Sequence, residues 1–272
     1  MKYSKEFEDA VSFAKEHTLF LGYGNPNGKI LMVGKEHYFH HKHNKDTKDF
    51  YDEIVAHRNV ENINNALSWE NNIKNKFVPN WDSVIPRQLL DSNPQTKYWN
   101  QKNKRNRQLK SGQWNGGTSS TYTYYQKIYQ NVFLSGNKEE CINFQKEFFI
   151  TELNDLPAKK DYKFQKLKEL KNKFITERQN LFNLPYFKSF PVVIIASGHY
   201  SRDFNFDIEK TFEVEWDKQT KISNSTWYNL HKSSDEKRLV IHTRQLSNRV
   251  SNIFIDDMSE LVKEFLQSSI EK

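Results

Sequence analysis

Four short apolar runs constrain the fold of this chain more than any other feature. Each is rich in Val, Ile, Leu or Phe, and long segments with helical spacing separate most of them. The runs lie at 30–33, 148–153, 191–196 and 239–241. Strands without polar alternation are buried on both faces, as in parallel sheets that helices cover on each side. The pattern therefore predicts the α/β class, with a three-layer α/β/α fold around a short, mainly parallel sheet.

Other parts of the chain give further secondary-structure signals. Amphipathic helices are predicted near the N-terminus and over 121–133, 162–184 and 250–266, where apolar residues recur at helical spacing. Alternation of apolar and polar residues predicts a half-exposed strand over 211–216, with 225–230 as its hairpin partner.

One long polar segment, at about 40–118, contains three prolines and many isolated aromatic residues. We interpret it as helices and loops inserted after the first strand of a single domain that spans residues 1–272. Aromatic residues make up 14% of the chain, which is typical of a folded protein rather than a disordered one.

The charge and the cysteine content narrow the function. Lys and Arg number 41 against 34 Asp and Glu, a net charge of +7 that favours a nucleic-acid partner. The single Cys excludes a disulfide framework and a cysteine-based zinc site. No stretch approaches the ~18 apolar residues of a membrane helix, and the first residues lack an apolar signal core. We expect a monomeric, cytoplasmic protein with no membrane contact and no cofactor.

A carboxylate, an amide, a flexible turn and an imidazole follow the four apolar runs. These positions hold Glu36, Asn154, Gly198 and His242. Ligands of open parallel sheets bind at the carboxyl ends of the strands, so we expect these residues to converge on one edge. A carboxylate and an imidazole can share acid/base work, and hydrolysis of a glycosidic bond needs such a division.

The neighbouring residues suit a nucleobase as the ligand. The amide of Asn154 can read the edge of a planar heterocycle, and Tyr38 and Phe39 supply rings for the walls of a slot. A basic surface would hold the phosphates on either side. The combination points to a base that is flipped out of DNA.

Four blocks of sequence resemble motifs of the uracil-DNA glycosylase superfamily, in the order of that family. Gly34-Lys-Glu-His-Tyr-Phe39 resembles its first motif, Gly-Gln-Asp-Pro-Tyr-His. His242-Thr-Arg-Gln-Leu-Ser247 resembles its last motif, His-Pro-Ser-Pro-Leu-Ser. Between them, 149–154 resembles the strand that ends in the base-reading Asn, and 192–198 resembles the strand that ends in a phosphate-contacting turn.

The resemblance implies a role for each matched residue at the base. Glu36 matches the carboxylate that positions water, and His242 matches the imidazole that faces a carbonyl oxygen of the base. Asn154 matches the base-reading amide, and Tyr38 matches the ring that excludes a 5-methyl group. Phe39 completes the proposed slot. The family typically acts without a metal, and the histidines at 37–43 lack a second ligand cluster that would indicate one.

A second group of residues is assigned to DNA. Gly198, His199 and Ser247 match phosphate contacts, and Arg244 is assigned to DNA binding with them. Leu246 matches the wedge that fills the gap left in the duplex. Structural alternatives remain for three assignments: Asn154 as a turn residue, His242 as a buried core histidine, and Leu246 as part of the core face of the last helix.

The sequence therefore predicts a monofunctional DNA glycosylase that leaves an abasic site. Schiff-base chemistry is not expected, because no lysine stands out near the strand ends. The expected base is uracil or, since both end motifs are altered, a modified cytosine such as a hypermodified base of phage DNA. A repair role and a defence role are both open. The alternative is a catalytically inactive DNA-binding module that retains the glycosylase fold.

Overall fold

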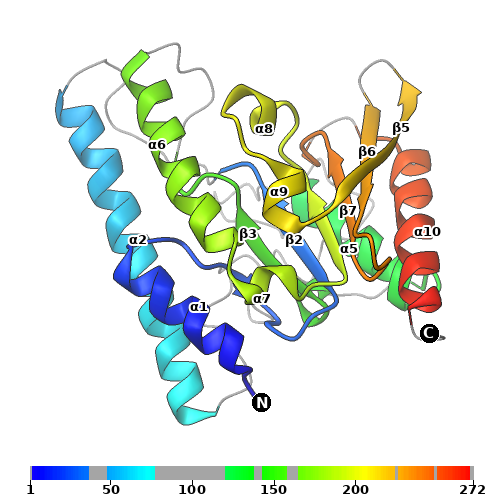
Figure 1. The fold of residues 1–272 in the computed structure, drawn as a ribbon, viewed down its shortest axis with the longest axis horizontal. Helices are drawn as coiled ribbons and strands as arrows, with labels where there is room; N and C mark the ends of the chain where they lie inside the picture. Colours follow the sequence, from blue (N-terminus) through cyan, green and yellow to red (C-terminus); the bar gives the residue numbers. More distant parts are fainter. Residues whose placement is uncertain are drawn as a thin grey trace, which may run out of the picture.

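The computed structural model of the chain describes residues 2–36, 48–76, 120–137, 143–157, 165–223, 226–247 and 250–269. Within these residues the molecule is an α/β protein with a mixed sheet and helices on both sides of it (Figure 1). The predicted α/β class is confirmed.

The sheet has seven strands in the order β1-β3-β2-β4-β7-β6-β5. Their bounds are β1 Tyr23–Gly24, β2 Ile30–Gly34, β3 Phe148–Glu152, β4 Val192–Ile195, β5 Glu215–Ser223, β6 Thr226–Lys232 and β7 Leu239–Thr243. The four apolar runs form the central block β3-β2-β4-β7, in which all neighbours are parallel. β1, β6 and β5 add antiparallel pairs at the two margins.

The helices fall into two groups on either side of the strands (Figure 1). Their bounds are α1 Lys5–Glu16, α2 Lys48–Asn75, α5 Ser120–Phe133, α6 Gln165–Phe182, α7 Pro185–Lys188, α8 Tyr200–Asp203, α9 Ile208–Phe212 and α10 Asn252–Ser268, with a 3-10 turn η3 at Phe144–Lys146. α1, α2, α6 and α7 form one group, and α5 packs against α10 in the other. The predicted helices at 121–133, 162–184 and 250–266 are confirmed to within three residues at each end.

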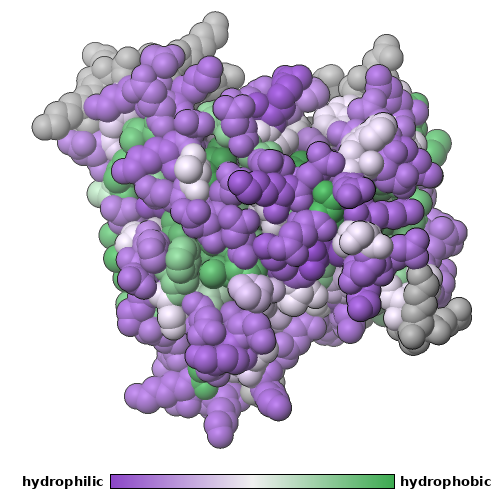
Figure 2. Space-filling view, viewed as in Figure 1, coloured by the Kyte–Doolittle hydropathy of each residue, from purple (hydrophilic) through white to green (hydrophobic). Residues whose placement is uncertain are grey.

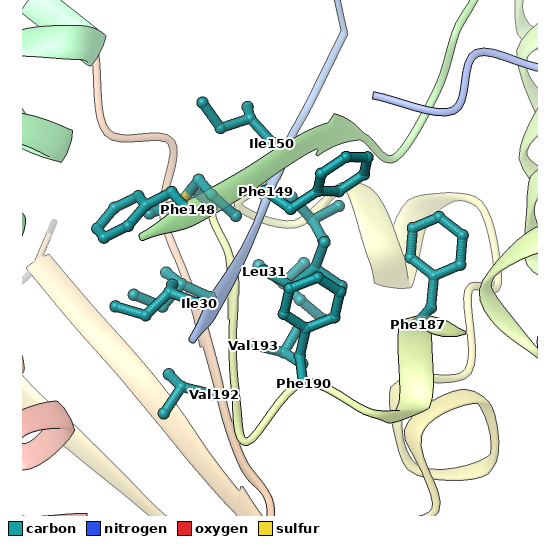
Figure 3. Close-up of a cluster of buried hydrophobic side chains, with 14 of the residues drawn as sticks. Ile30, Leu31, Phe148, Phe149, Ile150, Phe187, Phe190, Val192 and Val193 are labelled. Atoms are coloured by element: carbon teal, nitrogen blue, oxygen red, sulfur yellow. The ribbon is translucent and has the colours of Figure 1, made fainter. Parts of the chain in front are cut away.

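The core is built on the four parallel strands. Ile30 and Leu31 of β2 pair with Phe148 and Phe149 of β3 on one side, and with β4 on the other (Figure 3). Each of these four side chains is fully buried. Hydrophilic residues make up most of the face shown in Figure 2, with smaller hydrophobic patches between them. Burial on both faces explains why these runs carry no polar alternation.

The structure describes part of the polar segment at 40–118, and that part is a long helix. α2 runs beside α1 and contributes Trp69 to the main core, where its ring lies 5.0 Å from that of Phe7. Phe50 and Ile54 of α2 pack with Leu167 of α6 in a second, smaller core. This helix therefore forms part of the layer that covers the sheet.

The predicted strand over 211–216 is wrong in its first half. Residues 208–212 form α9, whose N-terminus is capped by Asp207, and Glu213 ends the helix in the left-handed conformation. β5 begins only at Glu215, while its predicted hairpin partner at 225–230 is confirmed as β6. The capping side chain satisfies a backbone N–H of the helix, and this local bond outweighed the alternating pattern.

Among the residues that the structure describes, no helix has the length and apolar content needed to cross a membrane.

Candidate active site

The topology of the parallel block selects one edge of the sheet. β2 lies between β3 and β4, so the chain connects from β2 to one side and then crosses to the other. In sheets of this kind the ligand crevice lies outside the carboxyl ends of the strands where the order reverses, which is between β2 and β4 here. Glu36 follows β2, Asn154 follows β3, Gly198 follows β4, and His242 lies near the end of β7. The predicted convergence on one edge is confirmed.

The two carboxylate oxygens of Glu36 differ in their contacts with the described residues. Its Oε1 lies 3.3 Å from the Lys171 Nζ of α6 and 3.8 Å from the Lys35 Nζ. Its Oε2 is buried and accepts no hydrogen bond from the residues that the structure describes. The side chain is 13% exposed. A buried carboxylate oxygen without a donor is the position at which a water or a ligand proton is most needed.

Tyr200 of α8 joins Glu36 to Asn154. Its hydroxyl accepts a hydrogen bond from the Asn154 Nδ2 at 3.4 Å. Burial raises the pKa of Tyr200, and the nearby Glu36 carboxylate raises it further. The ammonium groups of Lys35 and Lys171 lie 4.7 and 5.3 Å from the centroid of its ring. Tyr200 is therefore a neutral phenol at the centre of the edge, held among two cations and one carboxylate.

Asn154 is fully buried, and its amide is used within the protein. The Oδ1 accepts from the Leu156 N at 2.8 Å, which closes the turn after β3. The Nδ2 also donates to the Lys171 carbonyl at 3.3 Å. These bonds match the structural alternative for Asn154, a residue that shapes a turn. To read a base, the Asn154 amide has to give up at least one of these internal hydrogen bonds and form one with the base.

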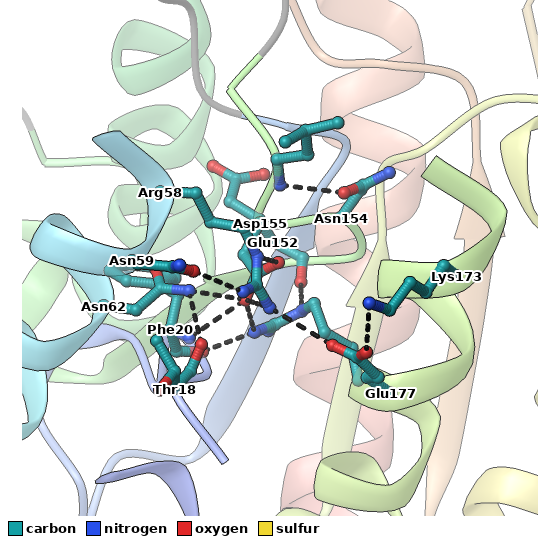
Figure 4. Close-up of polar contacts among 12 residues, drawn as sticks. Thr18, Phe20, Arg58, Asn59, Asn62, Glu152, Asn154, Asp155, Lys173 and Glu177 are labelled. Carbon is teal, nitrogen blue, oxygen red and sulfur yellow. Dashed lines mark hydrogen bonds and ion pairs between the residues drawn. The ribbon is translucent and has the colours of Figure 1, made fainter. Parts of the chain in front are cut away.

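Asp155, the next residue, is the centre of a buried ion-pair network (Figure 4). Its Oδ1 lies 2.7 Å from the Arg58 Nε, and its Oδ2 accepts from the Arg58 Nη2 and from the Asn62 Nδ2 at 3.1 and 2.9 Å. The Phe20 N also donates to Oδ2, and the Arg178 Nη1 lies 3.6 Å away. This network fixes the end of β3 to α2 and α6.

Glu152 closes β3 and packs directly on Gly34. A Cβ at Gly34 would collide with the Glu152 carboxyl group, so any larger residue at the start of the Gly34–Phe39 block would require that side chain to move. Burial raises the pKa of Glu152 to about 8, the Arg178 cation opposes this, and the Glu36 carboxylate adds to it. Glu152 is therefore largely protonated at neutral pH.

His242 is a buried and neutral imidazole. Burial lowers its pKa to about 4, so the ring carries a single proton at pH 7. The Nε2 lies 2.7 Å from the Gly198 carbonyl and 3.1 Å from the Ser201 Oγ. Because a carbonyl can only accept, we assign the proton to Nε2, which donates to Gly198.

An aromatic pair lies beside His242. The ring of Trp227, from β6, meets that of His242 edge to face at 5.3 Å. Trp227 also stacks on His199 with centroids 5.4 Å apart. Trp227 is not among the residues that the sequence predicts for the site. Its only sequence signal is its place in the predicted hairpin partner, so the pairing of β6 with β7 was needed to place it.

The residues assigned to DNA are divided by their exposure. Gly198 has a φ of 64°, in the region that favours glycine, and its N–H donates to the Thr243 carbonyl at 2.9 Å. Arg244 and Ser247 are partly exposed at the same edge, whereas Leu246 is fully buried in the main core. A wedge has to protrude from the surface, so Leu246 is a core residue in this structure, although it lies in the bend between β7 and α10 rather than on the last helix as the structural alternative had it.

Some predicted residues cannot be placed. Tyr38, Phe39 and the histidines at 37–43 lie outside the described residues. Within the described ranges, no group of three or more His, Cys, Asp or Glu is arranged to hold a metal ion.

Comparison of the chain with protein-family models, with curated proteins and with solved structures finds no match.

Proposed function

We propose that this protein is a DNA glycosylase with the uracil-DNA-glycosylase-like fold. It flips a pyrimidine nucleotide out of DNA and hydrolyses the N-glycosidic bond, which leaves an abasic site. One observation carries the proposal. The Glu36 carboxylate, one oxygen of which accepts no hydrogen bond from the described residues, and the neutral His242 imidazole lie at the same edge of the parallel block, on either side of the turn after β4.

The division of charge in glycosidic cleavage suits these two groups. Positive charge develops on the sugar and negative charge on the departing base as the C1′–N bond breaks. The Glu36 carboxylate holds the attacking water and faces the sugar cation. The Nε2–H of His242 gives up its hydrogen bond to the Gly198 carbonyl and donates to the oxygen of the base instead. A donor that binds the developing anion more tightly than the ground state increases the rate.

The base is uracil or a modified cytosine, and DNA is the partner. Arg244, Ser247 and the turn at Gly198 lie where the flanking phosphates would be bound. A chain with a net charge of +7 that neutralises ~6 phosphates should bind DNA with a log–log salt slope near −5.

The test is an excision assay with a panel of DNAs that carry different bases, in single and double strands, read out as alkali-labile sites. The substitution Glu36→Gln should lower single-turnover excision by about 10²–10³-fold and leave DNA affinity unchanged. Glu260→Gln, at an exposed position of α10, is the matched control and should excise normally. The proposal would be contradicted if the protein produced no alkali-labile sites in any DNA of the panel.

A second candidate is a DNA-binding module that retains the fold without the chemistry. It is favoured by the internal hydrogen bonds that occupy the Asn154 amide and the His242 Nε2. This module would bind DNA with the same salt dependence and release no base. Its DNA affinity would not change in Glu36→Gln.

A further inference from the structure

Lys171 is a lysine at the strand ends that the sequence did not single out. It lies on α6, and its side chain is only 12% exposed. Its Nζ is 3.3 Å from the Glu36 Oε1 and 5.3 Å from the centroid of the Tyr200 ring. Lys173, two residues along the same helix, is 65% exposed and pairs with Glu177 instead. The two lysines therefore differ sharply in their surroundings.

The surroundings of Lys171 favour a reactive amine over a simple surface cation. Burial lowers its pKa, and the Lys35 ammonium also lowers it, while the Glu36 carboxylate opposes both. Lys35 lies 3.8 Å from the same carboxylate oxygen. A lysine becomes nucleophilic when it is desolvated or lies next to another cation, and Lys171 meets both conditions. A carboxylate within reach can accept the proton that the ammonium has to lose.

We propose that Lys171 forms a Schiff base with the aldehyde of a ring-opened abasic deoxyribose held at this edge of the sheet. The ligand class is thus an abasic site in DNA. The inference rests on the proposed function, because an abasic site is the product of base excision. It replaces the expectation that the enzyme is monofunctional, which depended on the absence of a lysine near the strand ends.

The chemical step balances with the groups present. Lys171 loses one proton to Glu36, and its lone pair forms a bond with C1′ of the aldehyde to give a carbinolamine. One proton passes from the attacking nitrogen to the C1′ oxygen to give the carbinolamine hydroxyl, which takes up the proton held by Glu36 and leaves as water. The products are a protonated imine between Nζ and C1′ and one molecule of water, with no oxidant or reductant consumed.

The test uses the full chain and duplex DNA with an abasic site prepared beforehand, so that base excision is not required. Sodium borohydride added during the incubation reduces an imine to a stable amine and links protein to DNA. We expect a covalent adduct that peptide mass spectrometry places on Lys171. Lys171→Arg keeps the charge beside Glu36 but lacks the nucleophile, and it should lose the adduct. Lys173→Arg is the matched control and should retain it.

The outcomes separate this inference from the glycosylase proposal. No adduct with the wild-type protein, an adduct that maps to Lys35 or to the N-terminal amine, or an undiminished adduct in Lys171→Arg would each overturn the Lys171 assignment. The mapping on the wild-type protein needs no variant, so a poorly folded variant does not weaken the test. An enzyme that excises bases but is not trapped would retain the first proposal and lose this one.

Discussion

Two clusters of charged residues occupy the same edge of the sheet, and they differ in how completely they are paired. In the cluster around Asp155, the carboxylate is fully buried and both of its oxygens accept hydrogen bonds. In the cluster around Glu36, the carboxylate and Lys171 are 13% and 12% exposed, and the Glu36 Oε2 has no donor among the described residues. We call the Asp155 cluster saturated, because both of its carboxylate oxygens accept hydrogen bonds. With respect to the described residues, the Glu36 cluster is unsaturated.

The difference separates residues that hold the edge together from residues that are available for chemistry. A saturated, buried ion pair is costly to break, because a lone partner remains as a buried charge. An unsaturated pair that reaches solvent contributes little stability and leaves atoms free for a ligand. We therefore expect substitutions in the first cluster to change folding, and those in the second to change activity.

The largest effect is expected at Asp155. Asp155→Ala leaves the Arg58 and Arg178 side chains without their shared carboxylate, and it should lower the free energy of unfolding by about 3–5 kcal/mol. Asp203→Ala, which breaks the exposed pair with Arg202, is the matched control and should cost less than about 1 kcal/mol. Urea denaturation measures both, and similar losses would contradict the comparison.

Glu152 links the two clusters, and its effect should depend on pH. Its pKa is about 8 in the folded protein against an ordinary value of 4.5. Because the pKa of this acid is raised by folding, the contribution of Glu152 to the free energy of unfolding is fully present below pH 4.5. It is lost as the pH rises through about 8. Glu152→Gln should remove this loss, so the variant should gain a few kcal/mol relative to wild type at pH 8 but not at pH 4.5. Melting curves at the two pH values measure this, and a gain of the same size at both would disprove it.

Leu246 tests the boundary between the core and the DNA-facing surface. Because it is fully buried, Leu246→Ala should lower the free energy of unfolding by about 3 kcal/mol. Per folded molecule, action on duplex and on single-stranded DNA should fall equally. Ile253→Ala, at a site that is 71% exposed, is the control and should be close to neutral. A loss confined to duplex substrates would restore the wedge assignment.

The smallest effect on stability is expected at Glu36. Glu36→Gln keeps the shape of the side chain, and the Lys35 partner is 33% exposed, so the free energy of unfolding should fall by less than it does in Asp155→Ala. Single-turnover excision should nevertheless fall by about 10²–10³-fold. A large loss of stability would place Glu36 with Asp155 among the residues that hold the edge together. Thermal denaturation of the two variants in parallel gives this comparison directly.

Much of the scaffold could be predicted from local patterns in the sequence. The apolar runs at 30–33 and 239–241 became β2 and β7 because a strand buried on both faces needs several consecutive apolar residues. The convergence of Glu36 and His242 followed from the general rule for parallel strands. The helix at 208–212 was missed, because its last two residues overlap the alternating pattern at 211–216 and the Asp207 cap before that pattern was not taken as a helix start.

The sequence by itself determined the parallel block, the helices beside it and the four strand ends that meet at one edge. Only the tertiary structure decided which polar groups at that edge are saturated. It placed Lys171 against Glu36, 135 residues away along the chain, and put Trp227 beside His242. Periodicity records whether a residue is buried, because burial repeats along one element. The partner of a side chain depends on strand order and on helix packing, which no local pattern contains.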